Sequence, residues 1–260
     1  MRIWNGIPLL AILTASCASL FALDASDKSE WPKNTYVAPR AEKAPVIDGK
    51  ADDACWDQAQ WDGFDYLWLG EKVTPEDFSG RYKIVWTRDR VYILCEITDD
   101  VLLDVHKDPL KQWPNDDCVE IFVDADKSGG EHTFSHNAFA YHVATDYNVV
   151  DMGPDKRPHT YNDHVKTKIT KEGNLYTWEM EMTIYGDDYD EKSDKNQAMQ
   201  LKAGHEMGFM MAYCDNDASP KRESFIGTIV NEGVLNNMGW KNADCFGTLV
   251  LSGTGTEPKP

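Results

Sequence analysis

One stretch of the chain, residues 175–184, constrains the fold more than any other. Apolar side chains occupy every second position there, namely Trp178, Met180, Met182 and Ile184, with polar or charged residues between them. Successive side chains of a β-strand point to opposite faces, so this pattern predicts a strand with one buried face. A sheet that is packed on one side in this way indicates a β-sandwich.

Further strand and turn signals extend through the chain. Residues 81–86 and 91–97 flank the polar turn 87–90, which predicts a hairpin. A second hairpin turn is expected at 171–174, and further strands at 119–123, 138–144, 165–170, 209–214 and 247–251. Helix signals are confined to 52–60 and 194–200. The sequence therefore predicts an all-β fold, an antiparallel β-sandwich (jelly-roll or immunoglobulin-like) with one or two short helices.

The first residues have the composition of an export signal. Arg2 precedes an apolar run at 7–13 and then small residues, a pattern that is too short to span a bilayer. Cys17 ends a segment that resembles a lipoprotein box, while cleavage after Ala18 or Ala22 by the ordinary signal peptidase is the alternative. Either route predicts an exported protein that is periplasmic, extracellular or an outer-membrane lipoprotein with a lipid anchor.

These signals divide the chain into four parts. The expected boundaries are an export signal at 1–22, a linker and first strand at 23–44, a sandwich domain at 45–252 and a tail at 253–260. We expect the chain to be a monomer.

The charge balance restricts the class of ligand. The 44 acidic and 26 basic side chains give a net charge of −18, which repels phosphate backbones and therefore excludes nucleic acid as a partner. A neutral ligand or a cation remains compatible with this charge.

Five cysteines follow the signal, and export permits disulfides between them. They are Cys55, Cys95, Cys118, Cys214 and Cys245. Because five is odd, at least one thiol stays free or pairs outside the chain. No CxxC spacing or paired Cys/His spacing predicts zinc, and Cys95 and Cys214 fit buried strand positions.

Two tryptophans stand in polar loops that are far apart in the sequence. Trp113 precedes the strand at 119–123, and Trp240 precedes the last strand. Aromatic rings stack on the apolar C–H face of a sugar, so two such rings could hold one between them. Glu120 lies in the first of these strands, where a buried charge would need a partner. A ligand-binding carboxylate and a solvent-facing Glu beside a core Trp are equally compatible with this segment.

The order of the short motifs resembles the family 9 carbohydrate-binding modules, which are related to DOMON-type β-sandwiches. The motifs are Val46-Ile47-Asp48-Gly49, Trp56, Tyr92-Ile93, Trp113, 117–124, 181–184, Gly208-Phe209, Asp215-Asn216-Asp217, Trp240 and 246–249. The resemblance covers residues 45–252. It implies a β-sandwich that binds a terminal sugar without catalysis, between two tryptophans, and that carries structural calcium.

The resemblance also implies roles for single residues. Trp113 and Trp240 take the positions of the sugar clamp, Glu120 that of the carboxylate that contacts sugar hydroxyls, and Asn237 or Asn236 that of its amide partner. The family pattern includes an Arg and a Gln as well. His142 and Ala212 stand at the positions that align with them, and of these two only His142 can donate a side-chain hydrogen bond.

Calcium takes six to eight oxygen ligands, and acidic turns can provide them. Such turns contain Asp99-Asp100, Asp124 with Asp126, and Asp215 with Asp217. Asp124 and Asp126, which precede Gly129-Gly130, are the expected ligands. Solvated acidic turns on a strongly acidic chain are the alternative.

The expected function is non-catalytic binding of a neutral mono- or oligosaccharide, a plant-derived glucan or xylan, in support of polysaccharide degradation. Two alternatives remain open at this point. A glycoside hydrolase would use carboxylates such as Asp116, Asp117 and Glu120. A haem-carrying electron-transfer sandwich would use axial ligands from Met180, Met182, Met210, Met211 and His142.

Overall fold

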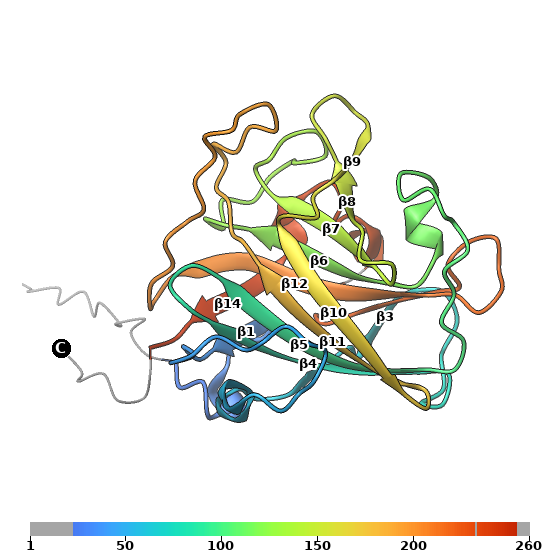
Figure 1. Cartoon of the computed structure of the whole chain (residues 1–260), viewed down its shortest axis with the longest axis horizontal. Helices are drawn as coiled ribbons and strands as arrows, with labels where there is room; N and C mark the ends of the chain where they lie inside the picture. The colour runs from blue at the N-terminus through green and yellow to red at the C-terminus, as the bar shows by residue number, and fades with distance from the viewer. Residues whose placement is uncertain (1–22, 232, 254–260) are drawn as a thin grey trace, which may run out of the picture.

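The computed structural model describes residues 23–231 and 233–253. Within them two β-sheets make up the fold, and the helical elements are short 3-10 turns (Figure 1). The expected all-β sandwich is therefore confirmed. The expected export signal at 1–22, with Cys17, and residues 254–260 of the expected tail lie outside the described residues. In the described part of the chain, no helix has the length and apolarity that a bilayer crossing requires.

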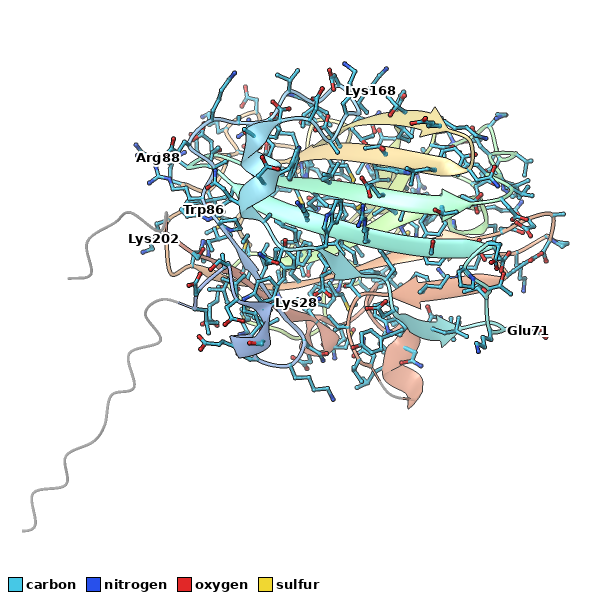
Figure 2. All side chains as sticks on the ribbon, turned by 90° about the horizontal axis from the view of Figure 1, so that it is seen from below. Lys28, Glu71, Trp86, Arg88, Lys168 and Lys202 are labelled. Carbon is cyan, nitrogen blue, oxygen red and sulfur yellow. The ribbon has the colours of Figure 1, made fainter. Side chains whose placement is uncertain are left out.

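The smaller sheet has five antiparallel strands in the order β10-β11-β5-β4-β2. They are β2 (Asp62–Gly63), β4 (Phe78–Trp86), β5 (Val91–Asp99), β10 (Val165–Glu172) and β11 (Leu175–Met182). Both hairpins expected from the sequence are present, as β4–β5 and β10–β11. The edge strand β10 carries lysines, and Lys168 points outward at the rim of the molecule (Figure 2). Such charges discourage pairing with another chain.

The larger sheet has nine strands and forms the second layer. Its main path is β1 (Thr35–Ala38), β14 (Gly247–Leu251), β12 (Glu206–Asp215), β6 (Cys118–Asp124), β7 (Phe139–Ala144), β8 (Val149–Met152) and β9 (Pro158–Thr160). The far end of β12 also pairs with β13 (Ser224–Gly227), which pairs with β3 (Tyr66–Leu69). Pairing is antiparallel except between β1 and β14, which are parallel.

The main core lies between the two sheets. Trp178, Met180 and Met182 of β11 are fully buried in it, as their alternation predicts. From the other sheet, β6 contributes Val119 and Ile121, so Cys118, Glu120 and Phe122 take the opposite, outer face. That outer face carries a second, smaller apolar cluster.

A corner of the chain covers the outer face of the five-stranded sheet at Glu179. The backbone N–H groups of Asp48, Gly49 and Lys50 donate to Oε2 of this buried carboxylate, and Trp56 Nε1 donates to Oε1. Four donors offset the cost of burying the charge. The motif at 45–56 is therefore a structural corner.

The two helix signals have different outcomes. The signal at 52–60 corresponds to a five-residue 3-10 turn, η2 (Ala54–Gln58). The helix expected at 194–200 is wrong, because this segment is irregular. The Asn196 side-chain amide donates to the carbonyls of Asp190 and Ser193 and accepts from the Asp190 N–H, which holds a loop instead.

Candidate functional site

A pocket of about 180 Å³ opens on the outer face of the nine-stranded sheet. Strands β6 and β7 contribute its floor. Its walls come from two 3-10 turns, η3 (Trp113–Asn115) and η4 (Gly233–Asn237), and from β3 and β13. The pocket therefore draws on segments that are distant in the sequence.

All six residues expected from the sequence to contact sugar line this single pocket. They are Trp113 in η3, Glu120 in β6, His142 in β7, Asn236 and Asn237 in η4, and Trp240 in the loop that follows.

Glu120 lies at the floor and is 2% exposed. Its Oε1 atom lies 2.9 Å from His142 Nε2 and accepts hydrogen bonds from Arg222 Nη1 at 3.0 Å and Cys214 Sγ at 3.0 Å. Burial alone would raise the pKa of this carboxyl, but the charges and hydrogen bonds of His142 and Arg222 outweigh it and lower the pKa to about 2. The pocket therefore contains an ionised carboxylate at neutral pH, which confirms that this buried charge has partners.

Among the described residues, the side-chain contacts of Glu120 converge on Oε1, which leaves Oε2 as the acceptor that a ligand can use. Two further polar atoms on pocket residues, His142 Nδ1 and Asn236 Oδ1, are buried and have no hydrogen-bond partner among the described residues. Buried polar atoms in folded proteins are nearly always paired with protein, water or ligand. The pocket thus has polar groups suited to hydroxyl groups.

Arg222 is the main site residue that the sequence did not indicate. It lies in the loop between β12 and β13, and besides Glu120 it donates to Asn237 Oδ1 at 3.0 Å. Its guanidinium also stacks 3.9 Å from the centroid of the Phe225 ring. The register places His142 and Ala212 on either side of Glu120. Neither residue has a guanidinium group, so the Arg of the family pattern has no counterpart at these two positions. Arg222, from another segment of the chain, places a guanidinium group beside the Glu120 carboxylate. No local sequence motif predicts this contact.

Aromatic rings form the walls. The Trp113 ring stands edge-on to the His142 ring, with the two ring centroids 6.1 Å apart. The Trp240 side chain is 39% exposed. Trp68 was also missed by the sequence reasoning, because β3 has only four residues. It is buried, its Nε1 donates to the Ile229 carbonyl, and its ring packs edge-to-face on Phe225.

A second carboxylate, Asp151 of β8, also lines the pocket. Its oxygens accept from the backbone N–H groups of Ala140 and Met152, each at 2.7 Å, and burial raises its pKa to about 7. Of the three carboxylates considered for hydrolysis, only Glu120 lines the pocket. Asp116 instead accepts from the backbone of the preceding loop, and Asp117 belongs to the cluster described next.

Three buried aspartates meet at one end of the sandwich, and we call Asp99, Asp117 and Asp215 the aspartate cluster. Their carboxylate oxygens lie within 4.8 Å of one another. Burial, followed by repulsion from neighbouring carboxylates, raises the pKa of Asp99 to about 6 and that of Asp215 to about 7.

In Asp117, burial and the charge of Asp99 raise the pKa to about 9, and Oδ1 accepts from the Asn216 N–H. Asp215 Oδ1 is buried without a partner among the described residues. A second group, Asp77, Asp100 and Asp217, lies more exposed. The residues present therefore fit a hard cation that takes oxygen ligands.

The aspartates expected to bind calcium lie elsewhere, in the turn after β6. Asp124 Oδ2 accepts from the Gly129 N–H and Asp126 Oδ1 from the Ser128 N–H. Among the described residues, no group of three or more metal-binding side chains includes either aspartate. The turn thus brings together fewer ligands than the aspartate cluster does.

The methionines considered as haem ligands are buried in apolar clusters. Met180, Met182 and Met211 pack between the sheets, and Met210 packs in the smaller outer cluster. His142 contacts Glu120 instead. These methionines fill the core, as alternation along a strand suggests.

A two-layer β-sandwich with an aromatic-walled pocket on an outer sheet face, and ionised and amide groups inside it, is an architecture of small-ligand binding domains. The family model described as carbohydrate family 9 binding domain-like matches residues 47–254. The chain belongs to this family.

Solved structures agree with this assignment. A family 9 carbohydrate-binding module from Caldicellulosiruptor kristjanssonii in complex with glucose superimposes with a TM-score of 0.63 at 21% identity, covering 87% of this chain and 100% of that chain. The same kind of module in complex with cellotriose gives a TM-score of 0.62 at 21% identity, covering 87% and 99%. These likenesses show the fold. A comparison with curated proteins finds no match.

Proposed function

We propose that this protein binds a neutral carbohydrate without catalysis, with one sugar ring held between Trp113 and Trp240. The observation that carries the proposal is the floor of the pocket, where the ionised Glu120 is held by His142 and Arg222 between aromatic walls. A carboxylate accepts strong hydrogen bonds from sugar hydroxyls, and the tryptophans cover the apolar faces of the ring.

The proposed ligand is the terminal sugar of a plant-derived glucan or xylan. A volume of about 180 Å³ suits a single ring better than the interior of a long chain. The related modules from Caldicellulosiruptor kristjanssonii were solved with glucose and with cellotriose, which supports a β-glucan. We expect dissociation constants between about micromolar and millimolar.

The test is calorimetric titration with cello- and xylo-oligosaccharides. Stacking contributes on the order of 1–2 kcal/mol per ring, so Trp113→Ala and Trp240→Ala should each weaken binding about tenfold. Trp61→Ala is the matched control, because Trp61 lies on the five-stranded sheet, where Arg81 and Lys83 stack on it.

Circular dichroism checks the folding of each variant. If both pocket variants are folded and bind as tightly as the parent, the clamp is wrong. Borohydride-reduced oligosaccharides, which lack a closed ring at the reducing end, then show which chain end is bound.

We also propose that the aspartate cluster holds a structural calcium ion. Asp99 ends β5 in one sheet, whereas in the other Asp117 directly precedes β6 and Asp215 ends β12. The cation would neutralise three buried carboxylates and connect the two sheets. Among the described residues, each location has a buried oxygen without a partner, Asp215 Oδ1 in the cluster and Asp124 Oδ1 in the turn. The cluster is preferred because three carboxylates meet there, whereas two meet at Asp124 and Asp126.

Export remains a proposal that rests on the sequence of residues 1–22. If Cys17 is lipidated, Cys17→Ser should release the protein from the membrane fraction. A mature chain that begins at Ser19 or Leu23 would indicate ordinary cleavage instead. An exported sugar-binding domain would serve polysaccharide degradation by retaining chain ends near the cell.

A further inference from the structure

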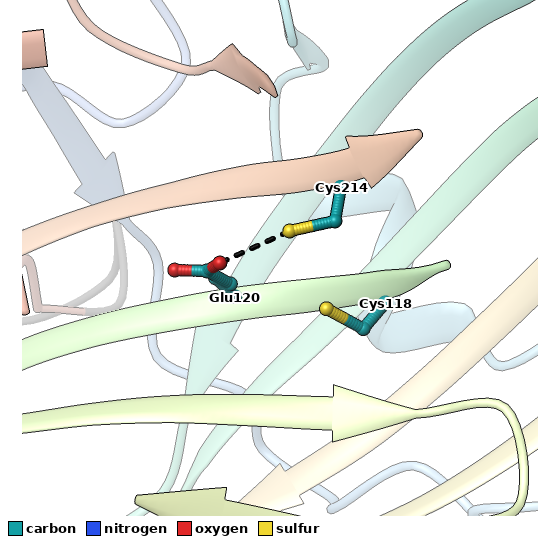
Figure 3. A group of neighbouring side chains, drawn as sticks. All are labelled: Cys118, Glu120 and Cys214. Carbon is teal, nitrogen blue, oxygen red and sulfur yellow. Dashed lines mark hydrogen bonds between the residues drawn. The ribbon is translucent and has the colours of Figure 1, made fainter. Parts of the chain in front are cut away.

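Two cysteines lie directly opposite each other beneath the pocket. Cys118 of β6 and Cys214 of β12 are register partners in the middle of the nine-stranded sheet, and both are fully buried. Their sulfur atoms and the Glu120 carboxylate lie within 4.8 Å of one another on the outer face of the sheet (Figure 3).

The backbone geometry suits a disulfide. Directly opposed residues of antiparallel strands have Cα atoms about 4.5–5.5 Å apart, and disulfides join Cα atoms about 4.4–6.8 Å apart. Both side chains leave the same face of the sheet, so a bond between the sulfurs is compatible with the observed strand pairing.

The other described cysteines have different environments. Cys95 packs between the sheets, Cys55 lies in η2 on the far side of the five-stranded sheet, and Cys245 donates to the Asn242 carbonyl. Among the described residues, Cys118 and Cys214 are the only cysteines that face each other across a strand pair.

Cys214 contacts two charged side chains of the pocket. Its Sγ donates to Glu120 Oε1 at 3.0 Å, and Arg222 Nη1 donates to the same sulfur at 3.2 Å. In the exchange described next, Cys214 is taken as the attacking thiol and Cys118 as the resolving thiol.

We propose that Cys118 and Cys214 form a disulfide that joins β6 to β12 under the sugar pocket, in exchange with a small-molecule or protein disulfide. The Cys214 thiolate attacks the oxidant's S–S bond and releases one thiol, forming a mixed disulfide. The Cys118 thiolate then attacks Sγ of Cys214 and releases the second thiol. The two cysteine protons end on the two released thiols, and the oxidant takes up two electrons.

The bond changes one contact in the pocket floor. A disulfide sulfur carries no proton, so Cys214 can no longer donate to Glu120 Oε1, while His142 and Arg222 still contact this oxygen. The pair also closes a loop of roughly 100 residues between two central strands, and loops of this length give substantial stabilisation. Formation of this disulfide does not depend on sugar binding.

The test starts from the full chain unfolded and fully reduced, so that burial does not protect the thiols. The chain is refolded with oxidised and reduced glutathione, remaining thiols are alkylated, and non-reducing peptide maps are read by mass spectrometry. We expect a linked pair of peptides containing Cys118 and Cys214. Reduction of the refolded protein should lower Tm by roughly 5–15 °C.

Three serine variants sharpen the result. Cys118→Ser and Cys214→Ser should each lose the linked peptides and the dependence of Tm on reductant. Cys245→Ser should keep both, which controls for loss of a buried thiol. Folded protein in which Cys118 and Cys214 are both alkylated, or bound only to glutathione, would overturn the proposal.

A second measurement covers failure to refold in vitro. The full chain is produced with export to the bacterial periplasm and alkylated under denaturing conditions without reductant. Linked peptides from Cys118 and Cys214 support the proposal. Two alkylated cysteines, or pairing of either one with another cysteine, contradict it. Neither measurement uses a sugar, so failure of the disulfide and failure of sugar binding are distinguishable.

Discussion

Glu120 is the residue on which the polar contacts at the floor of the pocket converge. It is surrounded by Val119 and Ile121 in sequence, yet the alternation of the strand places it on the outer face with Cys118 and Phe122. A buried carboxylate is costly without partners, and here two basic side chains contact a single oxygen. The same contacts that keep Glu120 ionised also orient it for a ligand.

Glu120→Gln should weaken sugar binding about tenfold or more and also destabilise the fold. The amide keeps the shape but removes the charge, so hydrogen bonds from hydroxyls weaken and Arg222 is left half-buried without its counter-ion. Calorimetry gives the affinity and urea unfolding gives the stability. Glu181→Gln is the control, since Glu181 pairs with Lys166 and Arg90 at the surface, where such pairs contribute about 0–1 kcal/mol.

The destabilisation should depend on pH in a defined direction. The pKa of Glu120 is lowered from 4.5 to about 2, so its charge stabilises the folded state fully above about pH 4.5. That stabilisation is lost as the pH falls from about 4.5 through about 2. The difference in unfolding free energy between the parent and Glu120→Gln should therefore shrink across this range. A constant difference from pH 7 to pH 2.5 in urea titrations would contradict this assignment.

At the level of elements, the loop after η4 positions Trp240 by close packing. A Cβ atom on Gly239 would lie 2.5 Å from Met210 Cε and 2.8 Å from Phe122 Cε1. Only a glycine permits this approach, so the loop lies against the outer cluster and presents the next residue to the pocket. The backbone is held further by His132 Nε2, which contacts the Gly239 carbonyl oxygen at 2.8 Å.

Gly239→Ala should displace this loop, lower the unfolding free energy by about 1–3 kcal/mol and weaken sugar binding several-fold. Gly186→Ala is the matched control, because a Cβ there meets its nearest atom at 3.4 Å. Thermal melts and calorimetry on both variants provide the measurement. Equal sugar affinity in Gly239→Ala and the parent would show that Trp240 does not depend on this packing.

Strand patterns in the sequence predicted most of the sandwich, but not the two short strands that form part of the pocket wall. Alternation and polar turns identified β4, β5, β10 and β11, because each strand is long enough for period two to be visible. The strands β3 and β13 have four residues each, and their partners are distant in sequence. Trp68 was missed for this reason.

The site was predictable where it coincides with motifs and not where it depends on register. Trp113, Glu120 and Trp240 stand in recognisable segments, and the pocket brings them together. Arg222 lies in a polar loop without periodicity, and its contact with Glu120 spans 102 positions. Likewise the aspartate cluster joins the ends of three strands, and only the fold shows that Asp99, Asp117 and Asp215 meet.

For the molecule as a whole, calcium should act as a connection between the layers. An ion that binds only the folded state stabilises it by mass action, so excess chelator should lower Tm and added calcium should restore it. Asp215→Asn should reduce the response to calcium, whereas Asp126→Asn should retain it if the ion lies in the aspartate cluster. The reverse outcome would place the ion in the turn after β6. A melt that is unaffected by chelator, with no calcium found by elemental analysis, would remove the ion altogether.

The parallel pairing of β1 with β14 has a consequence for folding. Thr35 pairs with Thr248, so the first strand of the sandwich cannot join the sheet until the last one is available. Long-range parallel contacts of this kind close slowly, because much of the chain must be ordered first. During that interval the apolar side chains of β1 are exposed to solvent. Tyr36, Val37 and Ala38 are all buried in the folded domain. A chaperone that retains this segment until the last strand is available would therefore act at the step where the unfolded chain is most exposed to aggregation.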